Sequence, residues 1–333
     1  MRIGLIGLGR IGAFHARTLS GLDTVDTLVV TDARPDVTDA VAAQVGARTA
    51  GSPEELLASG VDGVVIAAAT PAHPELLLAA VEAGLPVFCE KPLAGRIDDA
   101  VALAAKLAGR DERVQIGYPR RFDAGYAAAR AAVAGGELGR VHTVRATTLD
   151  PSPPPAEYLR VSGGIFRDCS VHDFDAIRWV TGREVVEVHA VGDTHGDPVF
   201  AEIGDVSTSQ AILTLDDGSH AVVSNSRYNP RGYDVRLELH GDADSVAVGL
   251  DAGLPLRSVE PGVTFPGGTP YAFFMDRLAP AFRAELTAFT GLVAGTTHSP
   301  CTVADAMAAG WIAEAATASL QSGRTVRLEE VVR

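Results

Sequence analysis

The first 118 residues alternate short apolar runs with amphipathic stretches, and this pattern predicts strands that alternate with helices. The predicted strands are 2–8, 27–32, 63–70, 85–92 and 113–118. The predicted helices are 13–21, 52–58, 74–84 and 98–109, of which the second has Ser52 as N-cap and Glu55 completing a capping box. Strands and helices in this order indicate a parallel, doubly wound sheet, and such sheets bind ligands beyond the carboxyl ends of their strands.

The pattern changes after residue 118, where longer runs of alternating apolar and polar residues follow a helix and a proline-rich loop. The predicted elements are a helix over 119–139, a strand over 141–150, the loop over 151–158, strands over 206–215, 220–228, 233–241 and 244–250, and helices over 281–295 and after Thr302. We expect an open, mostly antiparallel sheet with helices on one face. Its other face needs a cover, which predicts self-association as a homotetramer, or at least a dimer.

Length and composition set the domain count and exclude some classes of partner. The chain has 333 residues, 47% hydrophobic and 21% charged, which predicts two domains, 1–118 and 119–333, of an α/β protein. No apolar run is long enough to span a membrane and no secretory leader is recognisable, which favours a cytoplasmic location. A net charge of −14 disfavours a nucleic-acid partner. Three cysteines far apart in the sequence favour reduced thiols over disulfides or a metal site.

The segment GLGRIG follows the first predicted strand and opens the first helix, and the second strand ends in Asp32. Strand, glycines, helix, strand and a terminal acid about twenty residues on form the complete fingerprint of a dinucleotide-binding Rossmann domain. Gly7 permits the tight turn, Gly9 lets the backbone approach the pyrophosphate, and Gly12 lets helix and strand pack closely. Asp32 would bind the ribose hydroxyls and repel a 2′-phosphate, which predicts NAD as cofactor. Arg34, two residues on, keeps NADP possible.

Two further loops, TPAH at 70–73 and EKP at 90–92, lie at the carboxyl ends of predicted strands of the same sheet. We expect these loops, the glycine turn and the end of the second strand to hold the cofactor. The expected cofactor-binding residues are Gly7, Gly9, Arg10, Ile11, Gly12, Asp32, Ala33, Thr70, Pro71, His73, Glu90 and Lys91. A lysine after a strand is usually just solvated, but at a cofactor edge the Lys91 ammonium could polarise a substrate hydroxyl.

The stretch RDCSVHDFD, residues 167–175, places three aspartates and a histidine between strongly apolar flanks. On a helix of 100° per residue, Asp168, His172 and Asp175 fall on one narrow stripe opposite the apolar residues. Asp173 falls inside the apolar arc, so a local hydrogen bond or a helix end must accommodate it. The stripe is either a solvated face or a catalytic base with the group that orients it, since Asp168 and His172 lie one turn apart.

Several stretches also carry a family resemblance: GLGRIGAFHARTL, TPAHPELLLAAVEAG, FCEKPLA, QIGYPRRFDAGY and GGIFRDCSVHDFDAIRWV. Through them the chain resembles, over nearly its full length, the glucose–fructose oxidoreductase and inositol dehydrogenase family of nicotinamide-dependent sugar and polyol oxidoreductases. The resemblance implies a catalytic set of Lys91, Asp168 and His172. In this set His172 takes a hydroxyl proton, for which an unperturbed imidazole pKa of about 6.5 is suited, and Asp168 stabilises the imidazolium or shares a hydroxyl contact.

The resemblance also implies substrate contacts outside the catalytic set. The region from Tyr228 to Tyr233 resembles a substrate-contacting element of inositol dehydrogenases, and its additional residues Asn-Pro-Arg leave open which tyrosine contacts the substrate. The implied substrate-binding residues are Lys91, Arg121, Asp168, His172, Asp175, Tyr228 and Tyr233. Charged groups of both signs suit a polyhydroxylated substrate better than an apolar one.

Three functions compete on these observations. The first is an NAD-dependent dehydrogenase acting on myo-inositol or a close stereoisomer, with no metal required. The second is a dehydrogenase or reductase of a pyranose or another sugar derivative, with NAD or NADP. The third, from another class, is a non-catalytic sugar sensor that keeps the nucleotide domain; such a protein would be expected to lose Lys91 or His172, and both are present.

Overall fold

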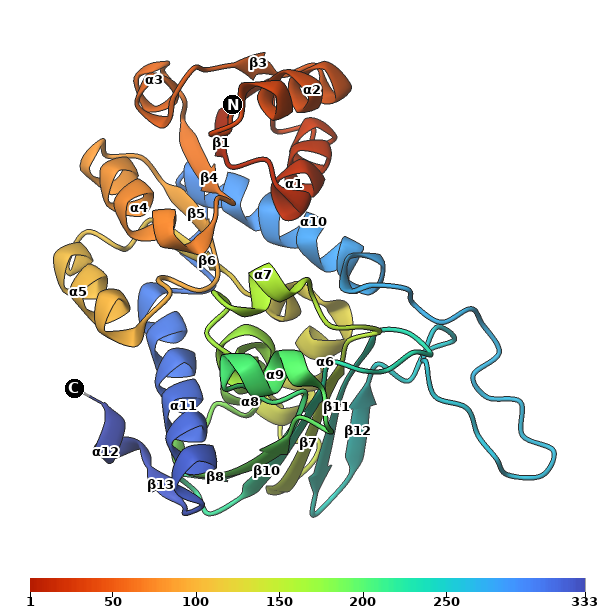
Figure 1. Cartoon of the computed structure of the whole chain (residues 1–333). Helices are drawn as coiled ribbons and strands as arrows, with labels where there is room; N and C mark the ends of the chain where they lie inside the picture. The colour runs from red at the N-terminus through yellow and green to blue at the C-terminus, as the bar shows by residue number, and fades with distance from the viewer. Residues whose placement is uncertain (333) are drawn as a thin grey trace. The chain divides into compact units, whose positions relative to one another are not determined.

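Each of the two units of the structure combines two segments that are distant in the sequence. The structure is a computed structural model, and it describes residues 1–332 (Figure 1). The first unit consists of Met1–Pro119 and Pro280–Met307, and the second of Arg120–Ala279 and the chain from Ala308 onward. Chain order alone therefore does not give the composition of either unit.

The first unit is built on a six-stranded parallel sheet with the order β3-β2-β1-β4-β5-β6. Its strands are β1 Arg2–Ile6, β2 Thr27–Thr31, β3 Arg48–Thr49, β4 Gly63–Ile66, β5 Val87–Glu90 and β6 Val114–Gly117. The direction in which strands are added reverses between β1 and β4, and sheets of this kind bind ligands at that point. The predicted doubly wound parallel sheet is confirmed, although β3 was not predicted.

Helices cover both faces of this sheet. They are α1 Arg10–Ser20, α2 Pro35–Val45, α3 Pro53–Ala58, α4 His73–Glu82, α5 Ile97–Leu107 and most of α10, Phe274–Val293. Leu5 on one face of β1 shares a core with α1 and α10, whereas Gly4 on the other face lies against Leu56 of α3. The Ser52 hydroxyl accepts a hydrogen bond from the Glu55 amide at 3.2 Å, so the predicted N-cap of α3 is confirmed. Helix α2 was not predicted.

Most of helix α10 belongs to the first unit, although the predicted domain boundary placed it in the second. The sequence analysis assigned all of 119–333 to the second domain because it followed the order of elements along the chain. In the structure, Leu286, Phe289 and Leu292 of α10 are buried in the core that β1 and α1 form, and Figure 1 shows α10 beside the N-terminal strands. The apolar side of α10 covers a face of the first sheet, which a sequential interpretation does not reveal.

The second unit is built on a seven-stranded sheet with the order β12-β11-β7-β10-β9-β8-β13. Its strands are β7 Val141–Leu149, β8 Val185–Asp193, β9 Thr208–Leu215, β10 His220–Ser226, β11 Asp234–Gly241, β12 Ser245–Val248 and β13 Val326–Arg327. Neighbouring strands are antiparallel except β7 and β10, so the predicted mostly antiparallel sheet is confirmed. Strands β8 and β13 were not predicted; β8 carries a register shift between Val185 and Glu187, which breaks the alternation that identifies strands.

Helices pack on one face of the second sheet and leave the other face open (Figure 1). The helices are α6 Ala124–Ala134, α7 Ala156–Leu159, α8 Val171–Thr181, α9 Pro198–Ile203, α11 Val303–Ser322 and α12 Leu328–Val331. Phe174 of α8 and Ile312 in the later half of α11 are buried in one core with the inward-facing sheet residues. On the opposite face Ile212 of β9 and Val222 of β10 are paired in register and are 48% and 38% exposed.

The predicted helix over 119–139 is interrupted at its start. A 3₁₀ turn, Pro119–Phe122, precedes α6, and the Asp123 carboxylate accepts hydrogen bonds from the Gly125 and Tyr126 amides. Asp123 is thus an N-cap that begins a new helix, because its side chain satisfies amides that no helical carbonyl can reach. The interruption separates the two arginines of the 3₁₀ turn from α6.

The stretch RDCSVHDFD also departs from a regular α-helix. Phe166–Ser170 form a π-helical turn, and α8 begins at Val171. A π turn contains more residues than an α turn, so the predicted spacing of 100° per residue does not hold between Asp168 and His172. Single π turns inside α-helices occur frequently at functional sites.

Asp173, the acid that the helical wheel placed among apolar residues, is fully buried and extensively hydrogen-bonded. Its carboxylate accepts hydrogen bonds from the Arg120 guanidinium, from the Thr148 hydroxyl at 2.9 Å and from the Asn225 amide at 2.8 Å. Burial would lower the pKa of Arg120, but Asp173 beside it raises that pKa well above its ordinary value, so the pair is ionic. Asp173 lies in the first turn of α8, so the expected helix end is present, whereas its hydrogen bonds are not local, because the donors come from three distant segments.

Replacing Asp173 with alanine is expected to destabilise the second unit strongly, because the Arg120 charge would stay buried without its partner. We expect a loss of about 3–5 kcal/mol in the free energy of unfolding, measured by urea denaturation. Arg160→Ala is the control for an exposed pair, since Arg160 pairs with Glu202 and the two side chains are 46% and 64% exposed. The control should lose no more than about 1 kcal/mol. Equal losses in the two variants would contradict the interpretation.

Candidate functional site

A glycine turn joins β1 to α1 in the first unit. Gly7 has φ +90°, and a Cβ there would lie 2.4 Å from the Ala68 backbone, so the turn requires glycine. A Cβ on Gly12 would lie 2.0 Å from the Gly7 carbonyl oxygen, so the packing of α1 against the turn requires glycine as well. At Gly9, the N-cap of α1, an added Cβ would meet nothing within 4 Å. The positive end of the α1 dipole thus adjoins open space, as pyrophosphate binding requires.

Asp32 follows β2 and lies beside this turn. Its Oδ2 accepts a hydrogen bond from the Leu8 amide at 2.7 Å, and its Oδ1 accepts from the amide and the Nε of Arg34 at 3.0 and 3.2 Å. Burial would raise the pKa of Asp32, but these hydrogen bonds and the Arg34 charge hold it below its ordinary value. Asp32 is therefore a carboxylate at neutral pH, and the Arg34 guanidinium that kept NADP possible is paired with it.

The loops that follow β4 and β5 are tied together by His73. This residue is buried, with Nδ1 2.7 Å from the Pro92 carbonyl oxygen and Nε2 3.0 Å from the Ala68 carbonyl oxygen. Thr70–Ala72 form a 3₁₀ turn directly before it. Because Pro92 adjoins Lys91, His73 fixes the backbone that carries this lysine.

Glu90 at the end of β5 is linked to α1. Its Oε1 lies 2.6 Å from Nε2 of His15, which is fully buried among aromatic rings. The ends of β1, β2, β4 and β5 thus form one connected group of loops in the first unit. They bring together the predicted cofactor-binding residues Gly7, Gly9, Arg10, Ile11, Gly12, Asp32, Ala33, Thr70, Pro71, His73, Glu90 and Lys91. Which of these side chains touch NAD stays a prediction.

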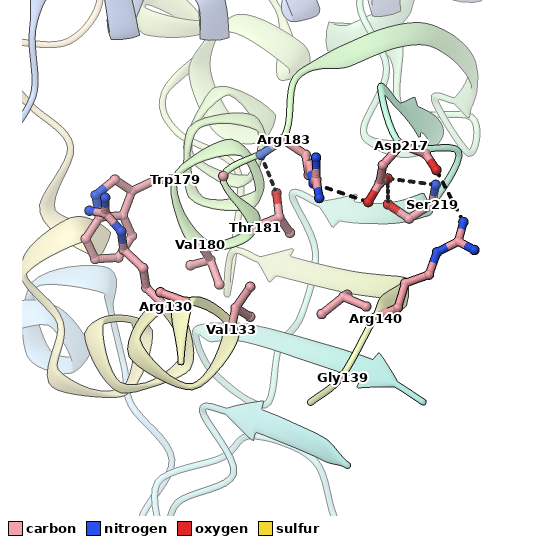
Figure 2. Close-up of a pocket in the computed structure, with 13 residues that line it drawn as sticks. Arg130, Val133, Gly139, Arg140, Trp179, Val180, Thr181, Arg183, Asp217 and Ser219 are labelled. Carbon is pink, nitrogen blue, oxygen red and sulfur yellow. Dashed lines mark hydrogen bonds and ion pairs between the residues drawn. The ribbon is translucent and has the colours of Figure 1, made fainter. Parts of the chain in front are cut away.

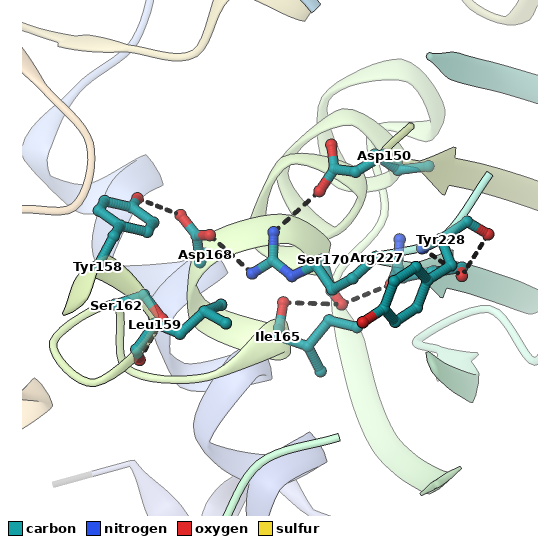
Figure 3. A network of polar contacts seen from close by, with 12 residues as sticks. Asp150, Tyr158, Leu159, Ser162, Ile165, Asp168, Ser170, Arg227 and Tyr228 are labelled. Carbon is teal, nitrogen blue, oxygen red and sulfur yellow. Dashed lines mark hydrogen bonds and ion pairs between the residues drawn. The ribbon is translucent and has the colours of Figure 1, made fainter. Parts of the chain in front are cut away.

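In the second unit, the Asp168 carboxylate lies in the π turn and has both oxygens hydrogen-bonded (Figure 3). The Tyr158 hydroxyl of α7 donates to Oδ1 at 2.7 Å, and Nη2 of Arg227 donates to Oδ2 at 2.7 Å. Nη1 of Arg227 donates to Oδ2 of Asp150 at 2.9 Å. The Arg227 side chain is only 3% exposed; burial would lower its pKa, but Asp168 and Asp150 outweigh that effect and raise it. The network therefore consists of one buried cation between two carboxylates.

Exposure separates the polar residues of this helix into two kinds. Asp173 and Asp175 are fully buried, whereas His172 is partly exposed and the Asp168 side chain is 9% exposed. Of these four residues, only Asp168 and His172 are not fully buried within the second unit. They are the two that were predicted to form a base and the group that orients it. Their catalytic roles stay a prediction.

Arg121 and Asp175 form a buried ion pair. The guanidinium donates from Nε to Oδ2 at 2.9 Å and from Nη2 to Oδ1 at 2.6 Å, and the two side chains are 5% and 1% exposed. The bidentate geometry is the strongest form of such a pair. The sequence analysis expected each residue to contact substrate; the structure pairs them with each other, and a direct substrate contact stays a prediction.

The two candidate tyrosines lie in different environments. Tyr228 is 45% exposed, and its hydroxyl donates a hydrogen bond to the Asp197 carboxylate. Tyr233 is 5% exposed and packs in the core against Phe274, with ring centroids 6.3 Å apart. Burial raises the pKa of Tyr233, so its hydroxyl stays protonated. Tyr228 presents its ring at the surface of the second unit, and Tyr233 does not.

Asp150, Tyr158 and Arg227 were not predicted from the sequence, although one signal could have identified the arginine. Residues with buried side chains alternate along β10, and Ala221, Val223 and Asn225 face the core. Arg227 continues that alternation, and a cation at an inward position requires an anionic partner. Asp150 and Tyr158 lie in or beside the proline-rich loop, where no periodic pattern was available.

A surface pocket of the second unit lies elsewhere. It is lined by side chains of α6, of the C-terminal end of α8 and of the turn between β9 and β10 (Figure 2). Figure 2 shows Arg130 against Trp179, at 4.6 Å from the ring centroid, and Arg183 directed toward Asp217, 3.2 Å away. Asp168 precedes the opposite end of α8, more than about 15 Å away along the helix axis. This pocket contains no predicted site residue.

The residues of the first unit fit a dinucleotide, by the glycine turn and the Asp32 carboxylate described above. Within residues 1–332, no cluster of three His, Cys, Asp or Glu side chains is arranged to hold a metal ion. In the same range, no helix combines the length and apolar character that crossing a membrane demands.

Comparison with known proteins agrees with both halves of this description. Residues 1–118 match the family described as an oxidoreductase family with an NAD-binding Rossmann fold, and residues 126–247 match the GFO/IDH/MocA C-terminal domain. Myo-inositol dehydrogenase Hyg17 of Streptomyces leeuwenhoekii is 41% identical over 303 residues, covering 90% of each chain. Myo-inositol 2-dehydrogenase of Thermotoga maritima is 36% identical and covers 100% of both chains.

Solved structures with a similar fold include proteins with the same names. The crystal structure of a myo-inositol dehydrogenase from Corynebacterium glutamicum superposes with a TM-score of 0.90 at 34% sequence identity, covering 98% of each chain. Sequence and structure therefore agree over both units. The chain belongs to the NAD-binding oxidoreductase family that combines a Rossmann domain with a GFO/IDH/MocA C-terminal domain.

Proposed function

We propose that this protein is an NAD-dependent dehydrogenase that oxidises a secondary alcohol of a cyclic polyol, myo-inositol or one of its stereoisomers. The observation that carries the proposal is the similarity, over nine-tenths of the chain or more, to proteins named myo-inositol dehydrogenase. The sites of both units support it, because one has the features of a dinucleotide site and the other presents charged and hydroxyl groups suited to a polyhydroxylated substrate.

When bound, NAD supplies the acceptor for the hydride that leaves the alcohol carbon. The part of this chain is to bind the cofactor at the glycine turn, to select NAD through the Asp32 carboxylate, and to handle the hydroxyl proton. His172 accepts that proton as a neutral imidazole. The Lys91 ammonium stabilises the negative charge that develops on the alcohol oxygen as the proton leaves. Asp168 remains a carboxylate and stabilises the imidazolium that forms at His172.

Arg121 and Asp175 complete the proposed substrate site. The buried carboxylate fixes the guanidinium plane, and Arg121 in that orientation donates hydrogen bonds to hydroxyls next to the reacting carbon. Tyr228, with its ring at the surface, supplies a further contact. A site that makes several such hydrogen bonds discriminates strongly against substrates that lack the hydroxyls, because its polar groups would be left unpaired.

We also propose a cytoplasmic location. Cys89, Cys169 and Cys301 are buried cysteines outside any disulfide of the described residues, as proteins of reducing compartments contain. NAD-dependent oxidation of a polyol would draw on the cofactor pool of the same compartment.

The first test is NAD reduction, followed at 340 nm as NADH absorbance, across inositol stereoisomers, aldoses and sugar acids. We expect turnover with one or more inositols, and turnover confined to aldoses or sugar acids would contradict the proposed substrate class. On the substrate so found, His172→Asn should lower kcat by roughly 10²–10⁴-fold with unchanged NAD affinity, because a general base contributes that much. Lys91→Met should lower kcat by roughly 10²–10³-fold, because a few kcal/mol of transition-state stabilisation are lost.

His142→Asn is the matched control, because His142 is an exposed histidine on β7 whose Nδ1 lies 3.0 Å from the neighbouring Thr143 hydroxyl. It should retain wild-type turnover. A His172→Asn enzyme that works within about threefold of wild type would exclude the general-base role, since that lies far below the usual range. Melting temperatures of both variants distinguish lost catalysis from lost folding.

Cofactor selection is expected to depend on Asp32. Asp32→Ala removes both the acceptor for the ribose hydroxyls and the repulsion of a 2′-phosphate, so the ratio of kcat/KM for NAD over NADP should fall. It also frees the Arg34 guanidinium from its partner. Arg34→Ala is the companion variant and should leave the preference for NAD intact. An unchanged ratio in Asp32→Ala would show that selectivity lies elsewhere.

We further propose that the protein self-associates through the open face of the second sheet, as a tetramer or at least a dimer. Ile212 and Val222 lie side by side on that face and are substantially exposed. The double variant Ile212→Glu, Val222→Glu should shift the mass measured by light scattering toward the monomer, because it buries charges at the interface. Val332→Glu, at a half-exposed residue near the C-terminus, is the control. A monomeric wild-type protein at micromolar concentration would contradict the proposal.

A further inference from the structure

We propose that Arg227 is a positioning residue for the reaction, one that keeps the Asp168 carboxylate ionised and fixed in orientation four residues before His172. The inference rests on the proposed function, in which Asp168 and His172 act together. Arg227 itself need not touch the substrate, since its side chain is almost completely buried. It acts through Asp168.

The geometry leaves Asp168 little freedom. Nη2 of Arg227 donates to Oδ2 at 2.7 Å, and the Tyr158 hydroxyl donates to Oδ1 at 2.7 Å, so each carboxylate oxygen has its own donor (Figure 3). The two donors come from different elements, one beyond the end of β10 and the other from α7. Rotation of the carboxyl group would break both hydrogen bonds at once. Two donors at fixed positions therefore determine the plane of the carboxylate.

The electrostatic surroundings explain why a guanidinium is needed. Asp150 accepts from Nη1 of the same arginine at 2.9 Å, and Asp205 lies close enough to interact with both Arg227 and Asp168. Burial raises the pKa of Asp205, although two backbone amides and the Arg227 charge lower it in part. Several carboxyl groups that share one partly buried site cannot all ionise without a cation among them. Arg227 is that cation.

Other titratable groups face this network, and they do not replace the guanidinium. Cys169 is buried in the π turn, and burial raises the pKa of its thiol well above the ordinary value, so it stays neutral. Tyr158 contributes a neutral hydroxyl. His172 is the group on the same helix that gains a proton in the proposed reaction. Its cationic form is favoured by an ionised Asp168 and disfavoured by a protonated one.

The consequence for the reaction is a division of roles. A carboxylate that already accepts a hydrogen bond from a buried guanidinium is a poor proton acceptor, so the hydroxyl proton goes to His172. Asp168 stays negative throughout and stabilises the imidazolium. If Arg227 were absent, Asp168 would take up a proton at a higher pH, and that stabilisation would be lost as the pH falls through the raised pKa.

Four variants test this proposal. Arg227→Met removes the charge and keeps most of the side-chain length, and Arg227→Lys keeps a charge without the planar fork. Asp150→Asn removes the competing anion, and Tyr158→Phe removes the second donor from a residue that is 43% exposed and tolerates change. Arg178→Met, at the far end of α8, is the matched control for loss of an arginine that pairs with an acid.

The direct readout is the carboxyl titration of Asp168 by carbon-13 NMR in protein labelled at its aspartate carboxyls, assigned with Asp168→Asn. We expect the Asp168 midpoint to rise by about 1–3 pH units in Arg227→Met, by less in Arg227→Lys and Tyr158→Phe, and to fall in Asp150→Asn. Shifts of the Asp168 midpoint in opposite directions in Arg227→Met and Asp150→Asn would show that the charges of these two residues control its ionisation. A merely structural role of either residue would not produce them.

The second readout is the pH profile of kcat/KM with the polyol found in the screen. In wild type the acidic limb reports one ionisation, that of His172, and its logarithmic slope is about one. In Arg227→Met the Asp168 ionisation adds a second step to this limb, so the slope rises toward two below the raised midpoint. The ratio of kcat/KM at pH 6 to that at pH 8 falls below the wild-type ratio, by up to about tenfold for the largest expected rise of the midpoint. Arg178→Met should keep the wild-type profile.

The outcomes separate the possibilities. An Asp168 midpoint that stays at its wild-type value in folded Arg227→Met would overturn the proposal. If Arg227→Met does not fold, an unchanged midpoint in both Asp150→Asn and Tyr158→Phe overturns it equally, and the expected shifts support it. A wild-type protein that oxidises no polyol contradicts the proposed function instead, and the NMR titration then still decides whether Arg227 controls the ionisation of Asp168.

Discussion

Buried charge is the constraint on which the second unit depends. The helix that begins with the π turn carries three aspartates on or near the core, and each is neutralised by an arginine from another part of the chain. The pairs are Asp168–Arg227, Asp173–Arg120 and Asp175–Arg121. An unpaired charge in such surroundings would cost several kcal/mol, so the position of every arginine is fixed by the acid that it meets. The acidic stretch is neither a simple solvated face nor a set of independent catalytic groups.

The three pairs also connect elements that the backbone alone would leave independent. Arg120 and Arg121 come from the 3₁₀ turn before α6, and Arg227 follows β10 on its inward face. Two pairs therefore join the helix to the 3₁₀ turn, the third joins it to the end of β10, and together they hold the helix in one orientation on the sheet. A buried ion pair is weak evidence for stability, but it penalises every arrangement in which the partners separate. The same interactions that position Asp168 thus help to specify where the helix lies.

Sequence patterns predicted the backbone of this protein better than its polar networks. The parallel sheet, its glycine turn and the antiparallel sheet follow from local periodicity and from the spacing of a few residues. Helix α10 was assigned to the wrong core because periodicity shows that a helix is amphipathic, without showing which sheet it covers. The wheel over 167–175 marked Asp173 as anomalous, yet its donors lie 25 or more residues away, and no local pattern could identify them.

The contrast between the two units has a physical origin. In the first unit, the dinucleotide site depends on backbone shape. Gly7 and Gly12 are required there because a Cβ at either position would clash with the backbone. Such requirements place glycines at a fixed spacing, which can be recognised in the sequence. In the proposed substrate site of the second unit, the orientation of the charged side chains is set by partners distant in the sequence. The sequence around one residue of such a pair does not identify its partner. That is why the cofactor could be inferred from a short motif, whereas the role of Arg227 emerges only when its distances to Asp150 and Asp168 are known.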